Sequence, residues 1–224
     1  SSTRISRMHT DEVRKIAHRL MGLGIVQETP QQIDLQCSID PTRFKIDMLL
    51  RRLSVIASTI HTEAMQALTE SNHELADDAI RREDEADMMY CLSLRLLLSA
   101  QHDRIIGDKI GLEEPSHILY YGLITRYLEI IADRAEYIAR LAIEFQTRSK
   151  EKTSKHLMNR IANMGELSHN VFLKAMDCVF TGDIEVANSL LEMARVIRNE
   201  HESLLKENPE HPVLRTVGIE LERI

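Results

Sequence analysis

Apolar residues recur at intervals of three and four positions along most of the chain, which is the spacing of amphipathic α-helices. The first long helix is expected to run from Asp40-Pro41 to about Leu68, because Asp40 suits the N-cap and Pro41 suits the first turn. Its inner face would carry Leu49, Leu53, Ile56, Ile60, Ala64 and Ala67. Further helices are predicted at residues 73–100, 115–148, 154–180 and 183–206, with a last one starting near Pro212. The pattern predicts an all-α fold.

The first 40 residues follow a different pattern and are expected to form a connector ahead of the long helices. A short helix is predicted at residues 10–21, where apolar residues share one face until Gly22 ends it. From Ile25 to Cys37, apolar and polar residues alternate on both sides of a turn at Pro30. This alternation is typical of a small β-hairpin.

The helical part of the sequence repeats itself. The segment around Ala64-Met65 returns around Ala175-Met176, 111 residues later. Leu128-Glu129 returns as Leu221-Glu222 after only 93 residues, so the connection between the second and third helices must be shorter in the second repeat. We therefore expect two tandem three-helix bundles, at residues 41–148 and 149–224, with the second bundle incomplete at its C-terminus.

Composition agrees with helices packed on helices and narrows the classes of function. Aromatic residues make up 4% of the chain and Trp is absent, so Leu, Ile, Ala and Met must fill the core. The formal net charge of −7 argues against nucleic-acid binding by this segment, because gripping a phosphate backbone requires a basic surface. The sequence shows no secretion signal and no membrane-spanning run, which predicts a cytoplasmic protein without membrane insertion.

The cysteines carry no evident chemistry. Cys37, Cys91 and Cys178 are far apart and odd in number, which suits neither a disulfide framework nor a zinc site. We expect them to be buried free thiols.

Four carboxylates occupy helix positions that should face neighbouring helices. Glu83 and Asp87 lie in line with apolar residues of the second long helix, and Glu129 and Asp133 repeat this spacing on the third. A buried carboxylate needs a cation, hydrogen bonds or a metal, so the four are candidate ligands for iron, zinc or magnesium. The alternative is ion pairing at a partly solvated helix interface, for which Arg81, Arg82, Arg126 and Arg134 are at hand.

Other candidate chemistry is weaker. Three Glu-x-x-His pairs end at His73, His117 and His169, and only Glu166 with His169 lies well inside an expected helix. A ferritin-like di-iron centre needs this spacing on two helices. The sequence contains neither a glycine-rich phosphate loop nor a nucleophile motif. We therefore expect no enzymatic activity.

Two segments resemble signature motifs of the PhoU family, phosphate-uptake regulators built of two three-helix repeats. Residues 79–87, AIRREDEAD, resemble the family's E(D)xxxD(N) motif, and residues 128–139, LEIIADRAEYIA, resemble its LERIGDHAxNIA signature. The closing Leu221-Glu222-Arg223-Ile224 resembles the opening of the same signature. The resemblance implies regulation of phosphate uptake through contact with the phosphate ABC transporter's ATPase or a sensor kinase.

The resemblance also implies multinuclear metal binding in some members, with Glu83, Asp87, Glu129 and Asp133 at the matching ligand positions. The sequence departs from the family signature at three positions, Ile130, Ala132 and Arg134. In the second repeat, Ala194 and Arg198 stand where the first motif's carboxylates would recur. A complete second metal cluster is therefore not expected.

The N-terminal part, including residues 22–29, resembles the connector of archaeal-type members that join an AbrB-like DNA-binding domain to the PhoU helices. The chain starts at Ser1 without Met and its last helix shows no stop signal, so we expect a fragment of a longer protein. We also expect the protein to be a homo-oligomer. The intact protein would then be a transcriptional regulator with this segment as its sensor. Two alternatives stay open: a carboxylate-bridged metalloprotein with redox or hydrolytic activity, and a dimerisation scaffold for a DNA-binding domain.

Overall fold

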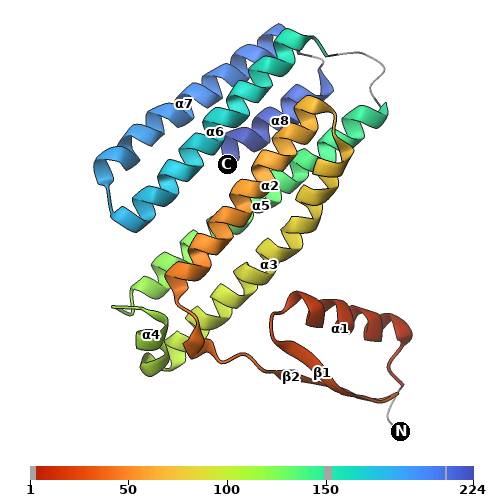
Figure 1. Ribbon diagram of the computed structural model, residues 1–224, viewed down its shortest axis with the longest axis vertical. Helices are drawn as coiled ribbons and strands as arrows, with labels where there is room; N and C mark the ends of the chain where they lie inside the picture. Colours follow the sequence, from red (N-terminus) through yellow and green to blue (C-terminus); the bar gives the residue numbers. More distant parts are fainter. Residues whose placement is uncertain (1–3, 149–152, 210) are drawn as a thin grey trace. The chain divides into compact units, whose positions relative to one another are not determined.

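The computed structural model describes residues 4–148, 153–209 and 211–224, which form eight α-helices and one two-stranded sheet (Figure 1). The elements are α1 (Arg7–Arg19), β1 (Leu23–Glu28), β2 (Ile33–Cys37), a 3₁₀ turn (Pro41–Arg43), α2 (Ile46–Glu70), α3 (His73–His102), α4 (Arg104–Ile110), α5 (His117–Arg148), α6 (Lys155–Thr181), α7 (Ile184–Glu207) and α8 (Pro212–Arg223). The expectation of an all-α fold with a small hairpin is confirmed. Within the described ranges, no helix combines the length and the apolar character needed to cross a membrane.

Packing divides the chain into two compact units. Residues 1–53 and 84–127 form the first unit, and residues 54–83 and 128–224 form the second. Helices α2, α3 and α5 each contribute a segment to both units. Because this division follows packing and not sequence similarity, the repeat boundaries expected at residues 40 and 148 stay a prediction.

The first unit begins with a capped helix followed by an antiparallel hairpin. The side chain of Ser6 accepts a hydrogen bond of 3.3 Å from the backbone N–H of His9, so α1 starts earlier than the apolar pattern indicated. β1 and β2 pair with Leu23 opposite Cys37. The predicted hairpin is therefore confirmed.

The start of α2 differs from the expectation. Oδ1 of Asp40 accepts hydrogen bonds from the hydroxyl of Thr42, at 2.7 Å, and from its backbone N–H, at 2.9 Å. These bonds, with the hydroxyl first, lower the pKa of Asp40. They close the 3₁₀ turn Pro41–Arg43, and the α-helix begins only at Ile46. Asp40 therefore caps a short turn and not the long helix.

Helix α4 was not expected from the apolar pattern. Asp103 caps its start by accepting a 2.8 Å hydrogen bond from the backbone N–H of Ile105. Gly111 ends it with a φ of 94°, a left-handed conformation that glycine adopts without strain. Lys45 donates a hydrogen bond of 2.8 Å to the carbonyl of Lys109. A helix this short shows no clear periodicity.

Burial confirms the expected stripe on α2 and corrects the one on α3. All six predicted positions of α2 are buried: Leu49, Leu53, Ile56, Ile60, Ala64 and Ala67. On α3 the apolar spacing predicts a stripe of Leu75, Ala79, Tyr90, Leu94 and Leu97. Ala79 and Leu97 are buried, but Leu75, Tyr90 and Leu94 are only half-buried, and the other buried residues include Ala76, Ala86, Met89 and Leu96. The core face of α3 is therefore rotated by about one residue from the predicted face.

Close packing in the second unit depends on small residues. α6, α7 and α8 each contact the other two, as expected for a three-helix repeat. Gly218 of α8 lies against His201 of α7, and a Cβ atom at Gly218 would stand only 2.3 Å from the His201 Nε2 atom. Gly165 of α6 lies in the same way against Met65 of α2.

The three cysteines form no disulfide among the described residues, as expected, but they are not buried. Cys91 and Cys178 are half-buried, and Cys37 is exposed at the end of β2. The prediction of burial was therefore wrong, and for Cys37 the reason is that a two-stranded hairpin presents little covered surface.

We predict that Gly218→Ala destabilises the protein by about 1–3 kcal/mol, because the added methyl group overlaps the buried His201 ring. Urea unfolding followed by circular dichroism measures the change. Gly122→Ala is the control, since its methyl group would lie 4.0 Å from Leu97 Cδ1 and would also improve helix propensity. Equal effects of the two substitutions would contradict the packing argument.

Candidate functional site

The four candidate ligands lie on α3 and α5 and differ in exposure. Glu129 is buried, with 8% of its surface exposed. Glu83 and Asp87 are half-buried, and Asp133 is exposed. The buried face of α5 is centred on Ala132 and Ala135, so a carboxylate at position 129 reaches its edge while position 133 turns toward solvent.

Asp87 pairs with an arginine from the N-terminal helix. In the first unit, Arg19 of α1 places Nη1 3.9 Å from Asp87 and Nη2 3.4 Å from Asp84. Exposed pairs of this kind contribute about 0–1 kcal/mol. The sequence suggested arginines from the bundle as partners and did not suggest Arg19, which lies far away along the chain.

Glu83 has a different cationic neighbour. Arg140 donates a hydrogen bond of 2.6 Å to Glu136, and this bond raises the pKa of Arg140, with a smaller contribution from the charge of Glu83. Arg140 lies on α5, one turn after Glu136, and therefore supplies positive charge next to two carboxylates of the second unit.

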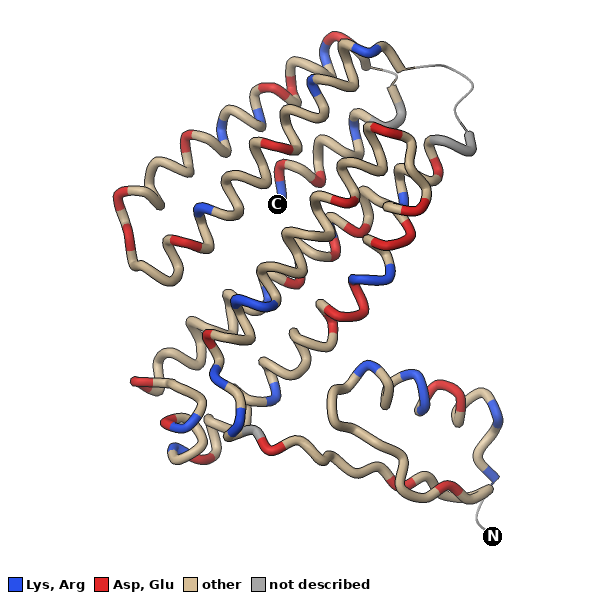
Figure 2. Tube along the Cα trace, viewed as in Figure 1, with Lys and Arg blue, Asp and Glu red and all other residues tan. Residues whose placement is uncertain are grey.

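Two of the arginines expected to neutralise the candidate ligands bond to other carboxylates. Arg82 makes two hydrogen bonds to Glu63, of 2.7 and 3.0 Å. Arg134 donates a hydrogen bond of 2.8 Å to the buried Glu220 of α8. Figure 2 shows acidic and basic residues interspersed along the helices.

The arrangement of these carboxylates gives no support to a metal site. Among the described residues, no group of three or more His, Cys, Asp or Glu side chains is placed so that it could hold a metal ion. The guanidinium groups of Arg19 and Arg140 already supply positive charge beside Asp87 and Glu83. Metal binding by the four carboxylates stays a prediction.

A histidine pair that the sequence did not indicate lies between α2 and α6 in the second unit. The rings of His61 and His169 are stacked, with centroids 5.1 Å apart and planes 9° apart. The hydroxyl of Ser58 lies 2.7 Å from Nε2 of His169. His61 is 2% exposed, and its Nε2 atom has no hydrogen-bond partner within the described part of the chain. Of the Glu-x-x-His pair noted in the sequence, only His169 joins this contact, because Glu166 is exposed.

Burial keeps both imidazoles neutral. Desolvation, with a smaller contribution from the neighbouring His169, lowers the pKa of His61 from 6.5 to about 3. Desolvation also lowers the pKa of His169. The contact between His61 and His169 is therefore uncharged at neutral pH and needs no counter-ion.

We predict that the free energy of unfolding falls as the pH drops from about 6.5 toward 3. In this range the unfolded chain holds a proton on residue 61 that the folded chain lacks, so acid favours unfolding by up to about 1.4 kcal/mol per pH unit. Above pH 6.5 the contribution is constant. Urea unfolding at stepwise pH measures the slope.

His61→Leu should reduce this slope, whereas His73→Gln, at an exposed position at the start of α3, should leave it unchanged. An identical slope in the wild-type chain and His61→Leu would show that residue 61 is not held neutral by burial.

Comparison with known proteins agrees with this fold. Residues 50–142 match the family model of the PhoU domain, and this range contains all four candidate ligands. The crystal structure of PhoU from Pseudomonas aeruginosa matches with a TM-score of 0.63 and 17% sequence identity, over 80% of this chain and 87% of that chain. A comparison with curated proteins finds no match. The family match covers residues 50–142, and the likeness to the crystal structure shows that the fold is shared over most of the chain.

Proposed function

We propose that the protein regulates phosphate uptake by binding a protein partner, as the PhoU resemblance implies. The observation that carries this proposal is the match of residues 50–142 to the PhoU domain. The likeness in fold to a PhoU crystal structure over 80% of the chain supports it. The partner would be the ATPase of a phosphate ABC transporter or a sensor kinase, and the regulator would act as a homo-oligomer in the cytoplasm.

An acidic stretch on α3 is the surface we assign to electrostatic recognition of the partner. Asp77, Asp84 and Glu85 are exposed there, and Asp87 is half-buried beside them. The chain as a whole carries a formal net charge of −7. Complementary charge speeds association and selects the partner, so a basic face on the partner would be favoured.

The connector resemblance extends the proposal to the intact protein. Residues 22–37 contain the hairpin expected for such a connector. With a DNA-binding domain attached upstream, this chain would be the sensor half of a transcriptional regulator. Because this chain carries a negative net charge, the attached domain would make the contacts with DNA.

The proposal is tested by affinity purification of the intact protein from its own cells, followed by mass spectrometry. We expect a phosphate-transporter ATPase or a sensor kinase to co-purify in high phosphate and to diminish on phosphate starvation. Recovery of neither protein under either condition would overturn the proposal.

We predict that Glu83→Gln with Asp87→Asn reduces recovery of the partner about fivefold or more, because one negative charge leaves the acidic stretch and a second leaves the neighbouring position 83 of α3. The fold should persist, since the ion pair of Asp87 is a long one at the surface. Glu185→Gln with Glu192→Gln, two exposed positions on α7, removes the same charge elsewhere and is the matched control. Equal recovery with both double variants would exclude a role for the α3 pair.

The same variant tests metal binding. If Glu83 and Asp87 are ligands, elemental analysis should find iron, zinc or magnesium in the purified protein and less of it in Glu83→Gln with Asp87→Asn. Equal metal content in the two proteins would end the metal prediction without affecting the partner proposal.

A further inference from the structure

An open apolar groove lies in the first unit between α3, α4 and the start of α5. Its volume is about 700 Å³, which is within the range of known binding sites. Leu94 and Leu98 of α3 line it on one side, and Leu119 and Leu123 of α5 line it on the other. Leu112, which follows α4, also lines it.

One leucine on the α3 side of this groove and two on the α5 side are exposed. Leu98 is 56% exposed, Leu119 is 71% exposed and Leu123 is 51% exposed. Tyr127, one turn further along α5, is 64% exposed. Single exposed apolar side chains are ordinary, but a group that lines both walls of one groove marks a surface that another molecule covers.

The spacing of these residues suits a helix as the covering element. Leu94 and Leu98 are four residues apart on α3, and Leu119 and Leu123 are four residues apart on α5. Such rows form the ridges between which the side chains of a third helix pack. Gly122 also lines the groove, and a Cβ atom there would meet only Leu97, at 4.0 Å, so the side chains of an incoming helix have room beside it.

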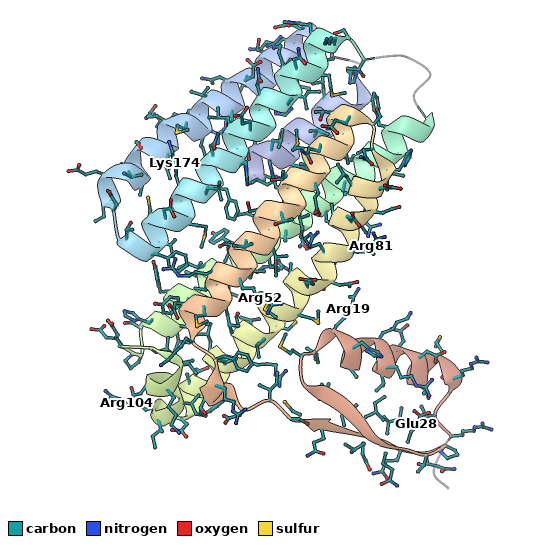
Figure 3. The ribbon with its side chains drawn as sticks, viewed as in Figure 1. Arg19, Glu28, Arg52, Arg81, Arg104 and Lys174 are labelled. Carbon is teal, nitrogen blue, oxygen red and sulfur yellow. The ribbon has the colours of Figure 1, made fainter. Side chains whose placement is uncertain are left out.

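The charges around the groove indicate the chemistry of that helix. Asp108, Glu113 and Glu114 line it together with a single arginine, Arg104, which Figure 3 labels. An acidic rim favours a partner with basic residues beside its apolar face and disfavours a second copy of this chain, whose groove carries the same acidic residues.

We propose that this groove binds an amphipathic helix of a partner protein, with apolar side chains between Leu98 and Leu119 and with Lys or Arg side chains against Asp108, Glu113 and Glu114. The proposal rests on the proposed function, because it names a second surface, besides the acidic stretch of α3, through which the regulator holds its partner. This binding mode is the helix-in-groove mode known from other recognition proteins.

The groove is tested with two fluorescent synthetic 18-residue amphipathic helices, one of Leu and Lys and one of Leu and Glu. Fluorescence anisotropy should give saturable one-to-one binding of the Leu/Lys peptide, at least tenfold tighter than binding of the Leu/Glu peptide. Glu113→Gln with Glu114→Gln should reduce the difference in affinity between the two peptides. Equal affinity of the wild-type chain for the two peptides would overturn the proposal.

A matched pair of variants locates the binding. Leu98→Glu with Leu119→Glu should weaken binding of the Leu/Lys peptide at least tenfold. Ile184→Glu with Leu191→Glu, at positions 74% and 62% exposed on α7, should leave it unchanged. All four positions are exposed, so both variants should fold, and circular dichroism confirms this. Equal affinities of the two variants would overturn the proposal, as would a wild-type dimer that Leu98→Glu with Leu119→Glu dissociates.

Different experimental outcomes would contradict the groove proposal and the phosphate-uptake proposal. If Leu98→Glu with Leu119→Glu loses the peptide but still recovers the ATPase or kinase from cells, the partner uses another surface and the groove proposal is wrong. If the wild-type chain binds the peptide but recovers neither protein, the phosphate-uptake proposal fails while the groove remains a helix-binding site.

Discussion

Burial of one face of α2 along its length is the constraint on which the other helices depend. The stripe from Leu49 to Ala67 is fully covered, and each buried Leu or Ile contributes about 1.5–3 kcal/mol relative to an exposed one. α2 contributes to the cores of both units. His61 lies next to this stripe, where a charged imidazole would be costly. The depressed pKa of His61 is therefore a consequence of the packing that α2 requires.

Much of this fold could be predicted from the sequence, because long helices repeat their apolar spacing many times. The positions of α2, α5, α6 and α7 follow from that spacing to within a few residues. Prediction was poorest where the signal was brief or weak. α4 is too short to show periodicity, and the core face of α3 is partly alanine, at Ala76, Ala79 and Ala86, so its larger apolar residues misplaced the face.

The candidate site was harder to predict, because spacing along one helix does not say what lies opposite. Glu83 and Asp87 were expected on the inner face of α3, and the structure places both at half-buried positions. The arginine beside Asp87, however, comes from α1, and the stacked His61 and His169 come from helices in different parts of the sequence. Contacts of this kind depend on tertiary packing. A single sequence indicates which face of a helix is buried but not which helices pack against each other.

The groove marks a difference between the two predicted three-helix repeats. It needs the long connection between α3 and α5, which contains α4 and Leu112. The corresponding connection between α7 and α8 runs only from Asn208 to His211 and leaves no length for a similar helix. A groove of this construction is therefore not expected between the described helices α7 and α8 of the second predicted repeat.

Exposed leucines favour association with any apolar surface, including another copy of the same chain. Like charges oppose that association, and this chain combines a net charge of −7 with acidic residues at the rim of the groove. Repulsion between copies would keep the groove open, whereas a basic helix would be attracted to it. The acidic balance of the sequence, which argues against nucleic-acid binding, is then also what selects the occupant of the groove.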